Sequence, residues 1–288
     1  MSELGFGTAR VGGVMADRSV DFVRLLSSAI DSGVTFIDTS NIYTQGESEA
    51  LVGRAVSGRR SEVFVCTKVG YQGSSSRNLA GRLKPLLRPV IRSMGIRRTM
   101  VPTSLRGTVA HDFSPAAMTD SVAGSLRRLA MDSVDLLLLH SPSAENLASG
   151  ESLEVLHDLR DRGMTRLVGI SLDRPVDPAL LEGVDAVQLP VNAFVKPQLI
   201  SYLAQLSEAG IGVIGRHALA SGRLAHPATE ADTGEELDTL TRIAAEAHIR
   251  GWSLAEAAFR DVHSLDGVST TLLGISRPEH LDAGLRWL

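Results

Sequence analysis

Val134-Asp135-Leu136-Leu137-Leu138-Leu139-His140 is an apolar run that ends in a histidine, and its pattern sets the expected fold. The earlier run Val63-Phe64-Val65-Cys66-Thr67-Lys68 has the same form and ends in a lysine. Neither run alternates apolar with polar residues, so both faces of each expected strand are buried. Such strands are typical of parallel sheets that lie beneath helices. The two runs therefore predict an α/β protein.

Six further apolar runs extend this pattern, and helical stretches separate or follow them. The additional expected strands are 4–8, 35–39, 167–171, 186–189, 213–216 and 271–275. The expected helices are 20–32, one that opens at 49, 118–130, 153–162, 197–209, 235–248 and 278–285. We count the pattern as eight strand and helix pairs, with seven helices located and none placed between residues 171 and 186, and this number favours a closed (β/α)8 TIM barrel over an open sheet. We expect residues 1–288 to form one such domain.

Polar residues stand at or just beyond the carboxyl ends of consecutive expected strands: Asp38, Tyr43, Lys68 and His140. A TIM barrel keeps its chemistry at this end. A buried ammonium lowers the pKa of a nearby phenol, so Lys68 is expected to make Tyr43 a better acid. Asp38 is expected to keep Lys68 charged, and His140 to hydrogen-bond a substrate carbonyl. The set predicts protonation of a developing alkoxide, with Tyr43 as the general acid.

Three of these residues also have a purely structural interpretation. Asp38 is a candidate helix cap, Tyr43 a candidate amphipathic loop residue, and His140 a candidate satisfied strand-end histidine. The joint placement of an acid, a phenol, an amine and an imidazole favours the proton relay, because structural roles do not require these four groups to converge.

A long insertion follows the expected strand that ends at Lys68. Residues 69–113 are far longer than the usual loop of about 2 to 6 residues between a strand and its helix. The stretch from Val69 to His111 contains no Asp or Glu. Two interpretations remain open: a solvated or oligomer-facing flap, or a lid that attracts an anionic substrate. Its basic residues are Arg77, Arg82, Lys84, Arg88, Arg92, Arg97, Arg98 and Arg106.

The amino-acid composition indicates which kinds of molecule the protein binds. The net charge of -4 argues against a dedicated nucleic-acid binder, because phosphate affinity depends on excess Lys and Arg. The single Cys66 excludes an internal disulfide, and we find neither a secretory leader nor a membrane-spanning run. We therefore expect a cytoplasmic protein with small-molecule partners and an unknown oligomeric state.

Other chemistries lack their motifs. No His, Cys or carboxylate cluster has zinc spacing, and no G-x-S-x-G nucleophile elbow is present. Gly5 and Gly7 begin a G-x-G-x-x-G pattern, but Arg10 stands where the last glycine is needed. We expect no metal, no serine acyl transfer and no Rossmann domain.

Several motifs resemble those of a known family. Asp38-Thr39-Ser40-Asn41-Ile42-Tyr43, followed by Gly46-Glu47-Ser48-Glu49 and Leu51-Val52-Gly53, resembles the DTA-x-x-Y-G and G-x-S-E-x-x-L-G motifs of the aldo-keto reductase superfamily. Later blocks in the same order are Cys66-Thr67-Lys68, Ser125-Leu126-Arg127-Arg128-Leu129, Asp135 to His140, Val168-Gly169-Ile170-Ser171 and Leu219-Ala220-Ser221-Gly222. The resemblance covers nearly the whole chain outside the insertion.

The resemblance implies a (β/α)8 oxidoreductase that binds a nicotinamide dinucleotide and uses Tyr43 as acid, tuned by Lys68 and Asp38. His140 would then orient the carbonyl. It also implies a cofactor site, in which Arg277 favours NADPH over NADH. The implied cofactor residues are Gly7, Thr8, Ser171, Gln188, Arg216, Leu219, Ser221, Gly274, Ser276, Arg277 and His280.

The chain departs from the resembled pattern near the cofactor. Leu172 replaces an Asn that usually follows the Ser, and Gly284 replaces an Asn near the end. Arg216, followed by His217, stands where members often have an aromatic that stacks on the nicotinamide, and a guanidinium plane can also stack.

We predict an NADPH-dependent reductase of an aldehyde or ketone that is polar, anionic or sugar-like. Two alternatives remain at this point: a non-catalytic nicotinamide-binding sensor or partner subunit, and an isomerase or dehydratase on the same barrel.

Overall fold

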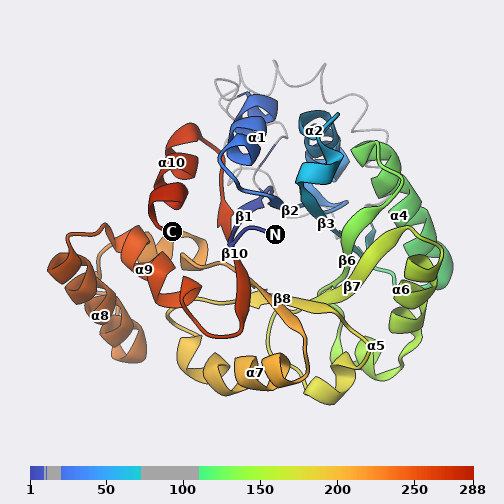
Figure 1. The fold of residues 1–288 in the computed structure, drawn as a ribbon. Coiled ribbons are helices and arrows are strands. Elements are labelled where there is room, and N and C mark those ends of the chain that lie inside the picture. Colours follow the sequence, from blue (N-terminus) through green and yellow to red (C-terminus); the bar gives the residue numbers. More distant parts are fainter. Residues whose placement is uncertain (10, 12–20, 73–109) are drawn as a thin grey trace, which may run out of the picture.

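Parallel strands close into a barrel at the centre of the molecule (Figure 1). The computed structural model describes residues 1–9, 11, 21–72 and 110–288. Within these residues the eight barrel strands run in the order β1-β10-β9-β8-β7-β6-β3-β2, so the predicted TIM barrel is confirmed. Their bounds are Leu4–Gly7 (β1), Phe36–Asp38 (β2), Phe64–Val69 (β3), Val134–His140 (β6), Thr165–Ser171 (β7), Ala186–Pro190 (β8), Gly212–Arg216 (β9) and Val268–Gly274 (β10).

Helices surround the barrel and cover the outer face of its strands (Figure 1). Among the described residues the α-helices are Phe22–Asp31 (α1), Glu47–Ala55 (α2), Pro115–Leu129 (α4), Ala144–Ala148 (α5), Glu151–Asp161 (α6), Lys196–Glu208 (α7), Gly234–Arg250 (α8), Leu254–His263 (α9) and Pro278–Arg286 (α10). The 3-10 helices are Tyr43–Gly46 (η1), Arg60–Glu62 (η2), Pro178–Leu181 (η5) and Ala220–Ala225 (η6).

The expected pairing of every strand with an α-helix is wrong after β7. Only the 3-10 helix η5 lies between β7 and β8, where two prolines, Pro175 and Pro178, interrupt a short connection. A proline lacks an amide hydrogen and pushes the preceding residue out of the helical region, so a longer helix does not form. The structure also has α9, a helix that the sequence pattern did not separate from its surroundings.

The core follows the two-residue period of the strands. Leu136 and Leu138 of β6 belong to the cluster inside the barrel, whereas Leu137 and Leu139 pack with the helices outside it. Successive strand side chains point to opposite faces, so one leucine run fills both layers. This explains why the run shows no alternation of apolar and polar residues.

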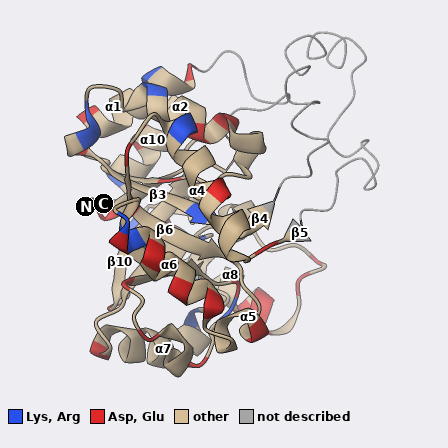
Figure 2. Ribbon diagram, turned by 90° about the vertical axis from the view of Figure 1, so that its right-hand side faces the viewer, with Lys and Arg blue, Asp and Glu red and all other residues tan. Residues whose placement is uncertain are grey.

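A short antiparallel pair forms the base of the insertion. Strands β4 (Tyr71–Gln72) and β5 (Ala110–His111) pair with each other, and the amide of Asp112 donates to the carbonyl of Gly70 at 2.8 Å. Figure 2 shows this pair at the end of the molecule away from both termini. The eight basic residues of the predicted lid, and most of residues 69–113, lie outside the described part of the chain.

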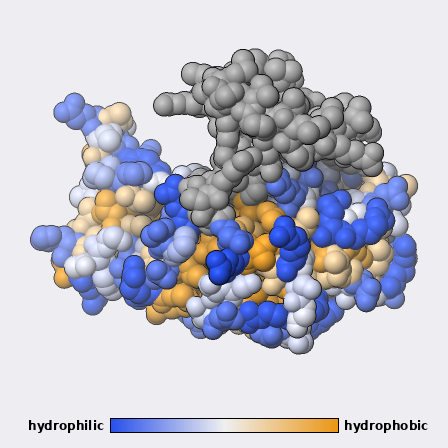
Figure 3. Space-filling view, turned by 90° about the horizontal axis from the view of Figure 1, so that it is seen from above, coloured by the Kyte–Doolittle hydropathy of each residue, from blue (hydrophilic) through white to orange (hydrophobic). Residues whose placement is uncertain are grey.

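The outer surface mixes residue types. Over the described part of the face in Figure 3, patches of hydrophobic residues are interspersed with hydrophilic ones. Among the described residues, no helix has the length and apolar character needed to span a bilayer.

A buried carboxylate joins α2, β3 and α4. Glu49, which is fully buried, accepts from the hydroxyl of Thr67 at 2.7 Å and from Nε of Arg128 at 2.6 Å. The two helices approach so closely that a Cβ added at Gly53 would lie 2.3 Å from the carbonyl oxygen of Leu129. These contacts give a structural reason for the G-x-S-E and L-V-G motifs of α2.

Gly53→Ala should therefore lower the free energy of unfolding by roughly 1 to 3 kcal/mol, because the new methyl group forces two helix backbones apart. Urea denaturation measures the change. Gly212→Ala is the matched control, since a Cβ there makes only ordinary contacts at 3.6 Å or more. Equal stability of the two variants would contradict the close packing of α2 on α4.

Candidate active site

The carboxyl ends of the barrel strands bring the predicted polar residues to one face. In the strand register Gly7 pairs with Asp38 on one side and with Gly274 on the other. His140 pairs with Ser171, which in turn pairs with Gln188. The candidate site therefore includes residues from strands far apart in sequence, held at one height of the barrel.

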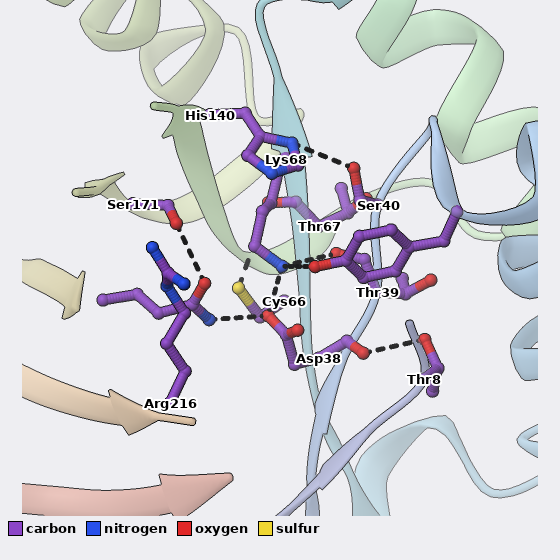
Figure 4. A network of polar contacts seen from close by, with 12 residues as sticks. Thr8, Asp38, Thr39, Ser40, Cys66, Thr67, Lys68, His140, Ser171 and Arg216 are labelled. Carbon is purple, nitrogen blue, oxygen red and sulfur yellow. Dashed lines mark hydrogen bonds and ion pairs between the residues drawn. The ribbon is translucent and has the colours of Figure 1, made fainter. Parts of the chain in front are cut away.

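Lys68 is the centre of a buried polar network (Figure 4). Its Nζ donates to Oδ1 of Asp38 at 2.5 Å, to the carbonyl of Thr39 at 3.0 Å and to the hydroxyl of Tyr43 at 3.2 Å. Lys68 and Asp38 are 1% and 3% exposed, so both charges depend on each other rather than on water. The three donor hydrogens of the ammonium are all used, which fixes its position.

Asp38 is held from a second side. Nε2 of Gln188 donates to Oδ1 of Asp38 at 2.8 Å, and Oε1 of Gln188 accepts from the hydroxyl of Ser171 at 3.0 Å. The hydroxyl of Thr8 donates to the backbone carbonyl of Asp38 at 2.8 Å. Strands β1, β2, β7 and β8 thus share one chain of hydrogen bonds that ends on the lysine.

The protonation states of this network suit a proton donor. Burial alone would lower the pKa of Lys68, but Asp38, with smaller contributions from Tyr43 and Cys66, raises the pKa above its ordinary value, so Lys68 stays charged. Burial raises the pKa of Tyr43, and Lys68 opposes this increase without reversing it. Lys68 lowers the pKa of Tyr43, as expected, but burial is the larger effect, so the pKa stays above its ordinary value. Tyr43 keeps its proton at neutral pH.

Tyr43 stands at the start of a strained turn. Thr44 and Gln45, which follow it in η1, have φ values of 49° and 63°, in the left-handed region that disfavours side chains. The hydroxyl of Thr44 donates to the carbonyl of Val11 at 3.0 Å. This contact holds the turn against the loop that follows β1.

His140 lies beside Tyr43 and beside the β4–β5 pair. Its ring centroid is 6.2 Å from that of Tyr43 and 4.6 Å from that of Tyr71, both edge to face. Nδ1 of His140 lies 3.3 Å from the hydroxyl of Ser40. Burial, then the charges of Lys68 and Arg216, lowers the pKa of His140 to about 2, so the imidazole is neutral.

This shift predicts a pH dependence of stability. The pKa of His140 falls from 6.5 to about 2 on folding, so the unfolded chain binds more protons between these values and stability decreases as pH falls below 6.5. The contribution reaches up to about 3 kcal/mol between pH 6.5 and 4.5. Urea denaturation at both pH values should show a smaller loss for His140→Gln than for the wild type. The exposed His226→Gln should behave as the wild type does; an equal loss in both variants would refute the prediction.

A cavity of about 370 Å³ opens beside the network. Asp38, Tyr43 and Gln188 line its polar end, which also contains Arg216. Of the predicted cofactor residues, the cavity brings together Gly7, Gln188, Arg216, Leu219, Ser221, Gly274 and His280.

The other predicted cofactor residues do not line this cavity. Thr8 and Ser171 are buried behind it and support Asp38 and Gln188. Ser276 contacts His280, with its hydroxyl 3.4 Å from Nδ1. Arg277 is exposed and forms the N-cap of α10.

Arg216, the last residue of β9, reaches past β8 to the residues that follow β7. It donates from Nη2 to the carboxylate of Asp173 at 2.6 Å and to the carbonyl of Leu172 at 3.0 Å. Its Nη1 lies 3.1 Å from Nδ1 of His217. Leu172 is buried, so this position supplies the site with a backbone carbonyl in place of a side-chain amide.

Sequence reasoning missed part of the cavity wall and the surroundings of His140. The missed wall residues are Ala9, Ala218, Leu272, Leu273, Ala283 and Trp287, while His217 and Gly222, which the sequence motifs included, also line the cavity. Around His140 the missed residues are Ser40, Asn41, Tyr71 and His111. Gly284, where an Asn was noted as missing, packs toward the core instead, because a Cβ there would meet Leu273 at 2.9 Å.

The likeness of this chain to known proteins extends over nearly its whole length. The model of the Aldo/keto reductase family matches residues 3–288 of the chain. The chain belongs to this family. The match makes it an oxidoreductase, and it extends across all eight barrel strands.

Curated relatives of this aldo/keto reductase include sugar dehydrogenases. D-threo-aldose 1-dehydrogenase from a Pseudomonas species is 29% identical over 300 residues, covering 96% of this chain and 86% of the relative. L-galactose dehydrogenase from Arabidopsis thaliana is 27% identical over 303 residues, covering 96% and 81%.

Solved structures share the fold. An aldo-keto reductase from Bacillus halodurans in its holo form has a TM-score of 0.76 and 25% identity, covering 99% of this chain and 86% of its own. An aldo/keto reductase from Klebsiella pneumoniae in complex with NADP and acetate has a TM-score of 0.72 and 23% identity, covering 100% and 86%. The latter likeness shows the fold of this aldo/keto reductase.

Proposed function

We propose that the chain is an NADPH-dependent oxidoreductase that transfers hydride to an aldehyde or ketone, with Tyr43 as the general acid. The observation that carries this proposal is the hydroxyl of Tyr43, which faces the cavity and lies 3.2 Å from the Lys68 ammonium. A phenol that keeps its proton beside a fixed cation can give that proton to an oxygen on which negative charge develops.

The residues at the cavity fit a nicotinamide dinucleotide. Gly274 lines the wall, and a Cβ there would meet no atom within 4 Å, so a ligand can approach the backbone closely. The amide of Gln188 and the plane of Arg216 lie at the polar end, where they would hold a flat amide-bearing ring. His280 belongs to the first turn of α10, and the amino end of a helix favours phosphate groups.

Residues of the chain supply the proton, stabilise the phenolate and exclude water. When bound, the reduced cofactor supplies the hydride. Tyr43 delivers the proton, and Lys68 stabilises the phenolate that remains. Asp38 and Gln188 hold the ammonium in place, so it does not move when the proton leaves. Apolar residues such as Leu219 and Trp287 keep water from the cavity wall.

The substrate class follows from the relatives and the site together. Two curated relatives are named as dehydrogenases of an aldose and of galactose. We assign this chain a sugar-like or otherwise polar carbonyl compound of small size. The arginine-rich lid proposed for an anionic substrate involves residues outside the described chain.

Titration with NADPH and with NADH, followed by nucleotide fluorescence, tests the cofactor. We expect NADPH to bind at least about tenfold more tightly, because the 2′-phosphate gains a charge-assisted contact with Arg277. Arg277→Ala should raise the Kd for NADPH by about tenfold and leave the Kd for NADH unchanged. Arg286→Ala, at the other end of the same helix, is the control. No binding of either nucleotide would overturn the proposed function.

A further inference from the structure

Arg216 places a second cation at the polar end of the cavity. It lines the cavity together with Asp38 and Tyr43, and Figure 4 shows its side chain extending toward Ser171 of the buried network. Among the described residues of the cavity wall, Asp38 and Arg216 are the only Asp, Glu, Lys or Arg side chains. The ion pair with Lys68 balances the charge of Asp38, so the charge of Arg216 remains.

The protein compensates the charge of Arg216 incompletely. Its Nη2 binds the carboxylate of Asp173, but that side chain is 69% exposed and does not line the cavity. Water therefore screens the carboxylate more than it screens the guanidinium, whose side chain is 16% exposed. Nε of Arg216 is buried and has no hydrogen-bond acceptor among the described residues. A ligand in the cavity therefore meets a net positive charge at this end.

The field of Arg216 extends to the groups around the proposed hydride transfer. Burial and Lys68 are the larger causes of the low pKa of His140, and Arg216 lowers that pKa further. Burial raises the pKa of Tyr43, and Lys68 and, more weakly, Arg216 oppose this increase. Hydride must reach the carbon whose oxygen Tyr43 protonates, so under the proposed function the nicotinamide ring also lies within this field.

The two redox forms of nicotinamide differ by one positive charge on the ring. The reduced ring is neutral, whereas the oxidised ring is a cation that a nearby guanidinium repels. An aromatic side chain at this position would act in the opposite direction, because the face of an aromatic ring attracts a cation. Arg216 therefore favours the neutral ring over the charged one.

We propose that Arg216 makes this protein select NADPH from a mixture of the reduced and oxidised cofactors and release NADP+ readily. Arg216 is then a residue that determines specificity for the redox state of the cofactor. The inference rests on the proposed function and adds a preferred direction to it, which is carbonyl reduction with little inhibition by the oxidised product. The two relatives described above are named as dehydrogenases, so this direction does not follow from them.

Isothermal titration calorimetry measures the Kd of NADPH and of NADP+ without turnover. At pH 8 an ordinary histidine is neutral, so arginine is the cation that the comparison reports. We expect the Kd of NADP+ to exceed that of NADPH by at least about tenfold in the wild-type protein. Arg216→Met should lower this ratio by about tenfold, because methionine removes the charge. Arg216→Lys keeps the charge and should keep most of the ratio.

A fragment and two further variants locate the effect. The fragment 2′-phospho-ADP-ribose lacks nicotinamide, so its Kd should be the same for Arg216→Met as for the wild type. Asp173→Asn should raise the ratio of the two Kd values by about twofold, since it removes the carboxylate that partly neutralises Arg216. Arg162→Met removes an arginine from an exposed ion pair with Asp158 and should leave the ratio unchanged.

The possible results separate this inference from the proposed function. A wild-type ratio near one, with both forms bound, would overturn the selection and leave the oxidoreductase proposal standing. A high ratio that neither Arg216→Met nor Asp173→Asn changes would refute the role of Arg216. If Arg216→Met loses affinity for the fragment as well, its cavity is damaged and Asp173→Asn decides. A wild-type protein that binds neither nucleotide would instead contradict the proposed function.

Discussion

Tyr43→Phe should lower kcat for carbonyl reduction by roughly 10²- to 10⁴-fold, the usual contribution of a positioned general acid. The substitution removes one oxygen and keeps the ring that packs edge to face on His140. Lys68 retains its bonds to Asp38 and to the carbonyl of Thr39, so the network stays intact. NADPH oxidation at the nicotinamide absorbance band measures the loss.

The control for this variant is its nucleotide affinity. Fluorescence titration should give a Kd for NADPH within about twofold of the wild-type value, because the phenol oxygen contributes little to nucleotide binding. A variant with wild-type kcat would show that Tyr43 is not the acid. A wild-type protein that binds NADPH and never oxidises it would favour the sensor interpretation, and conversion of substrate at constant absorbance would favour an isomerase.

Lys68→Met should lower the free energy of unfolding by about 3 to 5 kcal/mol, because it leaves the Asp38 carboxylate buried without its cation. Asp38 is 3% exposed and would lose its cationic donor, while the neutral amide of Gln188 would still donate to it. Activity should be lost as well, since the variant no longer stabilises the phenolate. Urea denaturation measures the first effect and NADPH oxidation the second.

Two comparisons separate charge burial from general damage. The double variant Asp38→Asn with Lys68→Met should be more stable than Lys68→Met alone, because no unpaired charge remains. Lys196→Met should cost at most about 1 kcal/mol, since the Lys196 pair with Asp261 is partly exposed and Arg242 also binds that carboxylate. If Lys68→Met lowered the free energy of unfolding no more than Lys196→Met does, the buried pair of Lys68 and Asp38 would not be a major contribution to stability.

The barrel could be predicted from the sequence because its strands are buried on both faces. The run from Val134 to His140 shows this most clearly, and its expected bounds match β6. Polar residues at the ends of such runs then converge because all the strands are parallel. The absence of an α-helix between β7 and β8 was harder to predict, because eight strands suggest eight helices. Pro175 and Pro178 prevent a helix only in this one connection.

The residues that form the cavity wall and the protonation of the site residues could not be predicted from the sequence. Trp287 and Leu272 resemble core residues in sequence, and only the closed barrel places them on a cavity. Tyr71 and His111 become neighbours of His140 through the β4–β5 pair, across a long insertion. The direction of the Tyr43 pKa shift depends on burial, which a motif does not report.

The left-handed turn at Thr44 and Gln45 has a consequence for how the phenol is kept ready. Left-handed backbone at two residues other than glycine costs on the order of 1 kcal/mol each, so an isolated segment of this sequence would relax to another shape. Distant parts of the barrel must therefore supply the free energy that keeps the hydroxyl aimed at its partner. The reactivity of Tyr43 therefore depends on the tertiary structure around this turn. A substitution that weakens packing near the turn should displace the Tyr43 hydroxyl before it unfolds the barrel.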